Sequence, residues 1–145
     1  MQMAEIDVKS YLKQIRLYDT HIHTKLEELS QLKESITKIT TTLKADVVSS
    51  SGSQDKLGDA VAKIVDLQNE INADIDRFVD AKKEVSSVLE KVDDPDQLQV
   101  LERRYVLFET FEQIAYEMNM TYRNVCYIHG KALLSVKAIL TKGFQ

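Results

Sequence analysis

The sequence predicts an all-α protein, a long antiparallel helical hairpin (a coiled coil) followed by a three-helix module that contains a helix-turn-helix. Three observations predict this fold. Apolar residues recur every seven positions along two long segments, which is the pattern of a coiled coil. The 145 residues include only 4 Gly and 1 Pro, a composition that suits helices better than sheets. Helix-capping residues then divide the C-terminal third into three shorter segments.

The first long helix is predicted over about residues 6–43. One apolar position of its repeat is filled by Val8, Ile15, Ile22, Leu29, Ile36 and Leu43. The second, three residues later, is filled by Tyr11, Tyr18, Leu32 and Ile39. Lys25 is the polar exception at that second position. Together the two positions form the apolar seam that a coiled coil buries.

A loop is predicted over residues 45–55, which are rich in Ser, Gly and Asp, and a second long helix from about Gln54. The apolar repeat of this helix is Leu57, Ile64, Ile71, Phe78, Val85 and Val92. Leu67 and Val88 fill its second position, where Asp74 is polar. Two such helices joined by a short loop should pack antiparallel. The predicted division is therefore a hairpin, 1–93, and a module, 94–145.

Further apolar residues widen the stripe of each long helix beyond the seam. Leu12 and Leu26 do so in the first helix, and Ile75 and Leu89 in the second. A stripe of this width indicates more than one helical neighbour. We expect these four residues to be covered by the C-terminal module, by a second copy of the chain, or by both. Val61 and Val65, nearer the loop, fit this scheme less well.

Asp94 and Pro95 mark the start of a third helix. Asp94 is the expected N-cap, Pro95 suits the first helical position, and Gln97 follows three residues after the cap. The apolar face of this helix is predicted to be Leu98, Leu101, Tyr105 and Phe108.

The helix-turn-helix is predicted from Thr110 to Leu140. Thr110 and Gln113 have the spacing of a capping box, and Asn119 can adopt the left-handed conformation that ends a helix. Met120 should point inward from the turn, and Thr121 should cap the second helix. The buried face of that helix is predicted to be Val125, Ile128, Ala132, Val136 and Ile139.

The opposite face of the last helix is the predicted DNA-binding site. Its early residues Arg123, Asn124 and Tyr127 are candidates for reading bases, because the start of a recognition helix meets base edges. Thr121, Tyr122 and Lys131 are candidates for phosphate contact. The alternative is a solvated face of a helix that only packs, and Leu134 on this face favours a protein partner for its later part.

The distribution of charge supports a nucleic-acid partner, although the formal net charge is −4. After Met118 the chain has Arg123, Lys131, Lys137 and Lys142 but no Asp or Glu. Lysines near the end of a helix also complement its dipole, which explains Lys137 and Lys142 without DNA. Arg123 lies in the first helical turn, where the dipole disfavours a cation, and is therefore the more informative residue.

The helix-turn-helix resembles region four of bacterial RNA polymerase sigma factors. The residues that carry the resemblance are Phe111-Glu112-Gln113-Ile114-Ala115, Met118-Asn119-Met120-Thr121, Val125 and Ile128-His129-Gly130-Lys131-Ala132-Leu133. Asn119 stands where that pattern commonly has Gly, and Gly130 where it commonly has a basic residue. The whole layout is similar to ArpU-type and sigma-like regulators of phages and mobile elements. The resemblance implies a sequence-specific DNA-binding transcription regulator, and it leaves contact with RNA polymerase open.

No pattern of catalytic, cofactor-binding or metal-binding residues is present, so we expect no enzyme activity, no cofactor and no metal. His21 and His23 point about 200° apart on a helix, and Cys126 with His129 offers too few ligands for a structural zinc site. The single Cys and the lack of a signal or membrane segment predict a cytoplasmic protein. A homodimer is one option for the regulator. The alternative functions are the DNA-recognition small subunit of a phage packaging terminase and a structural protein-interaction module.

Overall fold

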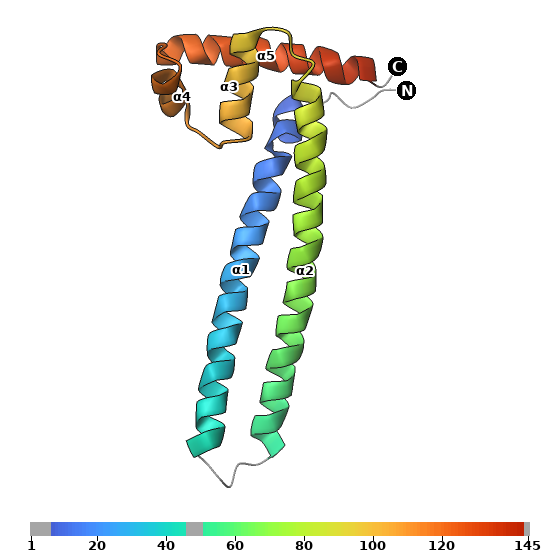
Figure 1. Ribbon diagram of the computed structural model, residues 1–145, viewed down its shortest axis with the longest axis vertical. Helices are drawn as coiled ribbons and strands as arrows, with labels where there is room; N and C mark the ends of the chain where they lie inside the picture. Colours follow the sequence, from blue (N-terminus) through green and yellow to red (C-terminus); the bar gives the residue numbers. More distant parts are fainter. Residues whose placement is uncertain (1–6, 46–50, 144–145) are drawn as a thin grey trace. The chain divides into compact units, whose positions relative to one another are not determined.

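The computed structural model describes the backbone of residues 7–45 and 51–143 and the side chains of 7–42 and 55–143. In these ranges all regular structure is helical, and no strand is present. The helices are α1 (Val8–Ala45), α2 (Ser51–Leu89), α3 (Pro95–Tyr105), α4 (Phe111–Glu117) and α5 (Tyr122–Gly143) (Figure 1). The all-α prediction is confirmed. No helix within the described residues is long and apolar enough to cross a membrane.

The hairpin seam follows the predicted repeat. Leu29 of α1 is buried with Leu67 and Ile71 of α2, and Leu32 and Ile64 pack against this cluster. Higher residue numbers in α1 thus meet lower ones in α2, as expected for antiparallel helices. Figure 1 shows the two helices running side by side. Helix α2 begins at Ser51, so the last part of the predicted loop, 51–55, is helical instead. The rest of that loop, 46–50, lies outside the described residues.

Within one chain, two of the four extra apolar residues of the hairpin are covered, and cover of the other two by a second copy stays a prediction. Leu12 and Leu89 are buried, at 0% and 2% exposure. Leu26 and Ile75 are exposed instead, at 45% and 41%. Both lie in the stretch of the hairpin where α1 and α2 bury only the seam itself, so no helix of the same chain covers these flanking positions.

Lys25 and Asp74, the two polar residues of the predicted seam, pair with each other. The Lys25 Nζ donates a hydrogen bond of 2.6 Å to Asp74 Oδ2, and Arg77 Nη1 donates one of 3.0 Å to Asp74 Oδ1. Glu70 Oε2 lies 3.8 Å from the same Lys25 Nζ. These cations, Lys25 foremost, hold the pKa of Asp74 below its ordinary value. A charge inside a helix seam is tolerated only when it is paired in this way.

Replacing Asp74 with Asn should destabilise the protein near neutral pH and have less effect in acid. Because the folded-state pKa of Asp74 is depressed, its stabilisation is present above the ordinary value of 3.8 and is lost as the pH falls through the lower folded value. Urea denaturation of both proteins at pH 6 and pH 3 measures this difference. The exposed Asp66, replaced with Asn, is the matched control on the same helix. An Asp74→Asn effect that is equal at both pH values would contradict the assignment.

The described chain divides into two compact units. One, Tyr18–Arg77, comprises the later part of α1 and the earlier part of α2. The other combines the start of α1, up to Leu17, with the chain from Phe78 onwards. The predicted division at residues 93 and 94 falls between the end of α2 and the start of α3, whereas one compact unit combines the start of α1 and the end of α2 with α3, α4 and α5. The division into two domains at residues 93 and 94 therefore stays a prediction.

Helix α3 begins as predicted but ends earlier. The Asp94 carboxylate accepts hydrogen bonds from the backbone N–H groups of Asp96 (2.9 Å) and Gln97 (3.1 Å), and Pro95 is the first helical residue. The buried face consists of Val100, Leu101 and Tyr105. Phe108 does not belong to it, contrary to the prediction, because the helix ends at Tyr105 and Phe108 has a positive φ of 60°.

Candidate nucleic-acid interface

Helices α4 and α5 and the turn between them form the predicted helix-turn-helix. The Thr110 backbone N–H donates to Gln113 Oε1 (2.7 Å) and the Gln113 N–H donates to Thr110 Oγ1 (3.2 Å), which completes the capping box. Asn119 has a φ of 54°, as predicted for the residue that ends α4. The Thr121 hydroxyl caps α5 by accepting from the Asn124 N–H at 3.1 Å. These local bonds define the start of each helix and the turn between them.

A small apolar core holds the two helices together. Val100 of α3, Ile114 and Ala115 of α4, and Val125 of α5 are buried in one cluster. Met120 is among the residues packed against it, so the turn points an apolar side chain inward as predicted. Figure 1 shows α3 and α4 lying against the longer α5. The burial of Val125 fixes how α5 is rotated about its own axis, and therefore which residues face away.

The six predicted DNA-contact residues are exposed. They are Thr121, Tyr122, Arg123, Asn124, Tyr127 and Lys131. The Tyr122 and Tyr127 side chains are 51% and 60% exposed, whereas Val125 between them is 0% exposed. The structure therefore exposes the cap of α5 and five residues of its first three turns, which is the arrangement that reading a DNA groove requires.

Two aromatic side chains of the candidate face make contacts with neighbouring residues. The Lys131 Nζ lies 5.0 Å from the centre of the Tyr127 ring, and hydrogen bonding to Tyr127 raises the pKa of Lys131 above its ordinary value. The Tyr122 ring meets Phe111 of α4 edge to face, with centroids 6.3 Å apart. Tyr122 thus packs on Phe111, which itself packs against the buried cluster of α3, α4 and α5. The Lys131 ammonium is charged at neutral pH, as a phosphate contact needs.

His129 is buried in the core, which the sequence analysis did not predict. Its Nε2 and the Tyr105 hydroxyl share a hydrogen bond of 2.7 Å, and the Phe111 ring packs edge to face on it with centroids 4.9 Å apart. Burial, with smaller effects of Lys9 and Arg104, lowers the pKa of His129 from 6.5 to about 4. Its spacing from Val125 and Ala132 was the available signal, since the buried residues of α5 are Val125, His129, Ala132, Val136 and Leu140.

We predict that protonation of His129 destabilises the fold. The unfolded chain takes up this proton near pH 6.5, but the folded protein only near pH 4. The stabilisation from keeping the imidazole neutral is therefore complete above pH 6.5 and is lost as the pH falls from 6.5 through 4. An NMR titration of the imidazole signals, beside urea denaturation at pH 7 and pH 5, checks both statements. A His129 signal that titrates near 6.5 in the folded protein would contradict them.

Two arginines of α3 brace the connection to the helix-turn-helix, and sequence reasoning did not find them. Arg103 Nη1 donates to both carboxylate oxygens of Glu109, at 3.1 and 3.2 Å. Arg104 Nη1 donates to the Glu109 carbonyl at 3.0 Å, and its guanidinium lies 4.4 Å from the Phe111 ring centre. Farther along, the Ser135 hydroxyl donates to Gln97 Oε1 at 2.6 Å and so joins α5 to α3. The candidate face is therefore carried by a braced scaffold.

The described residues contain no group of three or more His, Cys, Asp or Glu side chains that could hold a metal ion. Cys126 is half-buried and lies on α5 next to the candidate face. The chemistry that the face offers is hydrogen bonding, positive charge and exposed aromatic rings.

A comparison with protein families shows which family the chain resembles. The sequence model of a family described as "Protein of unknown function (DUF1492)" matches residues 38–135, which is more than half of the 145-residue chain. The matched part contains all six residues of the candidate face. No curated protein and no solved structure matches the chain significantly.

Proposed function

The chain belongs to the DUF1492 family, and we propose that it is a sequence-specific DNA-binding transcription regulator. In this proposal the start of α5 enters the major groove of double-stranded DNA. The family description assigns no activity, so the support comes from the site.

The observation that carries the proposal is the orientation of α5. Arg123, Asn124 and Tyr127 are exposed while Val125 is fully buried among α3 and α4. Arg pairs with guanine and Asn with adenine in the major groove, so the exposed side chains have the right chemistry for base reading. Among the described residues, no carboxylate forms an ion pair with Arg123, so its guanidinium is available to a base or a phosphate.

Charge also favours this end of the chain for binding DNA. From Asn119 onwards there is no Asp or Glu, whereas the rest of the chain contains all 23 acidic residues. A polyanion such as duplex DNA would therefore meet the acid-free helix with the least repulsion. Tyr122 and the Thr121 hydroxyl lie beside the helix start, where they can hydrogen-bond phosphate oxygens.

Selection of bound sites from random duplex DNA tests the proposal. We expect one motif to be enriched, and the affinity for that motif to fall steeply with salt because phosphate contacts release counterions. Scrambled duplexes of the same length and composition are the control. Equal, weak binding to all duplexes would reject sequence-specific recognition. No binding at low salt would reject the DNA proposal and favour the protein-interaction alternative.

A further inference from the structure

Helix α2 carries a second stripe of uncharged residues beside the seam that faces α1. Its members are separated alternately by four and three residues: Val61, Val65, Gln68, Asn72, Ile75 and Val79. This spacing keeps side chains on one side of a helix. The four aliphatic members are exposed, at 46%, 49%, 41% and 44% in chain order, and both amides are exposed as well. The stripe runs along one uninterrupted helix.

The stripe has the composition of a helix–helix interface. Charged residues make up 29% of the chain, yet none occupies these six positions. Its only polar members, Gln68 and Asn72, are neutral amides that can donate to and accept from each other. A polar amide within an apolar helix seam fixes the register of the two helices.

The stripe is also self-complementary. Reading outward from Glu70, it has an amide two residues away, an aliphatic residue five away and Val nine away, in both directions. If two copies of α2 lie antiparallel with their Glu70 residues level, Gln68 faces Asn72, and Val65 faces Ile75. The same patch then serves on both copies, as a two-fold symmetric interface requires.

Charges at the end of the stripe favour antiparallel over parallel packing. Asp76, Asp80, Lys82 and Lys83 all lie toward its C-terminal end. In a parallel pair each would face its own copy. In the antiparallel pair Asp80 and Lys82 are level with Ala60 and Gly58 of the second copy. Each of the four charged residues then stands ~18 Å or more along the axis from the same residue of the second copy. That separation exceeds the Debye length of about 8 Å at physiological salt, so repulsion between the like charges is largely screened.

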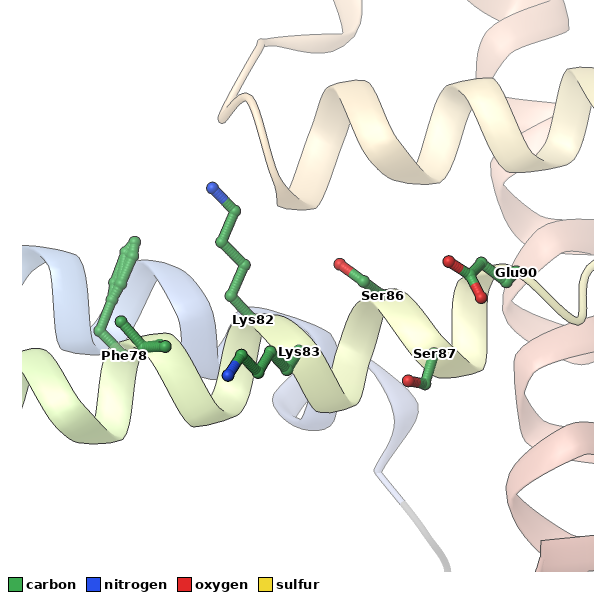
Figure 2. Close-up of a pocket in the computed structure, with 7 residues that line it drawn as sticks. Phe78, Lys82, Lys83, Ser86, Ser87 and Glu90 are labelled. Atoms are coloured by element: carbon green, nitrogen blue, oxygen red, sulfur yellow. The ribbon is translucent and has the colours of Figure 1, made fainter.

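A lysine lies just beyond the C-terminal end of the apolar part of the stripe. Figure 2 shows Lys82 and Ser86 projecting from the same side of α2, where they continue the spacing of the stripe beyond Val79. The Lys82 ammonium lies 5.9 Å from the Phe78 ring centre, so a charge marks the end of the apolar part.

We propose that this stripe is the interface between two copies of the chain, which pack antiparallel along α2 about Glu70. The interface spans ~27 Å of helix. Because it is short, the dimer should dissociate on dilution within the micromolar range accessible to sedimentation. The interface is independent of the proposed DNA function, since none of its residues belongs to the candidate face.

Sedimentation equilibrium of the full-length protein over a range of concentrations tests the interface. We expect the wild type to dimerise. Val65→Glu and Ile75→Lys should each raise the dissociation constant about tenfold or more, because each places an unpaired charge in an apolar seam. Leu17→Lys, at a 53% exposed apolar position on α1, is the matched control and should change nothing. A wild type that stays monomeric throughout, or variants that dimerise like it, would overturn the proposal.

Mixing the two variants tests the direction of packing. Position 65 of one copy faces position 75 of the other in the antiparallel pair, so the Val65→Glu protein mixed with the Ile75→Lys protein should form a heterodimer through opposite charges. The double variant Val65→Glu/Ile75→Lys should regain much of the wild-type affinity. Association restored by mixing also excludes misfolding as the cause of the single-variant losses. A double variant weaker than either single one would indicate parallel packing and overturn the proposal.

Discussion

Replacing Leu101 with Ala should lower the free energy of unfolding by about 2–5 kcal/mol, which is the usual cost of removing a large aliphatic side chain from a packed core. Leu101 lies on α3 and is 0% exposed. Its neighbours on that face, Val100 and Tyr105, contact the core beneath the helix-turn-helix and His129. The surrounding helices cannot close the cavity without losing these contacts. Urea denaturation followed by circular dichroism measures the loss.

The chain offers a matched control for this change. Leu134, on α5, is 67% exposed, and Leu134→Ala removes the same atoms from a position in water. We expect its effect to stay within about 0.5 kcal/mol, as for most surface substitutions. If the two variants lost equal stability, the burial assigned to α3 would be wrong. If Leu134→Ala were the more destabilising, the packing of α5 would have to be reconsidered.

Replacing Arg123 with Glu should reduce affinity for the selected DNA motif about 10- to 100-fold. One side chain that reads a base contributes about 1–3 kcal/mol, and a carboxylate in its place also repels phosphate. Stability should change little, because Arg123 is exposed. Lys131→Ala should instead weaken binding to all sequences and make the salt dependence shallower, as loss of a phosphate contact does. Fluorescence anisotropy at several salt concentrations separates the two effects.

The control for Arg123→Glu is Lys63→Glu, which makes the same change in net charge at an exposed position of α2. It should leave affinity nearly unchanged. Equal losses in both variants would mean that the overall charge of the chain governs binding, and that the start of α5 has no special part in it. An unchanged affinity after Arg123→Glu would remove Arg123 from the proposed site.

Properties that depend on residues close in sequence could be predicted from it. The seven-residue repeat predicts the hairpin because every two turns of each helix place the same two apolar positions in the buried seam. Caps predict helix starts because their bonds join residues two or three apart, as at Asp94, Thr110 and Thr121. The exposure of Arg123, Tyr127 and Lys131 follows from the same logic, since a buried Val125 determines the opposite face of α5.

Properties that depend on which distant residues meet were decided only by the tertiary structure. The sequence marks Lys25 and Asp74 as exceptions, but their pairing requires the register between α1 and α2. The spacing along α5 groups His129 with Val125 and Ala132, but the hydrogen bond between its ring nitrogen and the Tyr105 hydroxyl, 24 residues earlier, requires the packing of α3 on α5. Leu12 and Ile75 have the same pattern in the sequence, yet one is buried and the other exposed, because exposure depends on a neighbouring helix that periodicity does not specify.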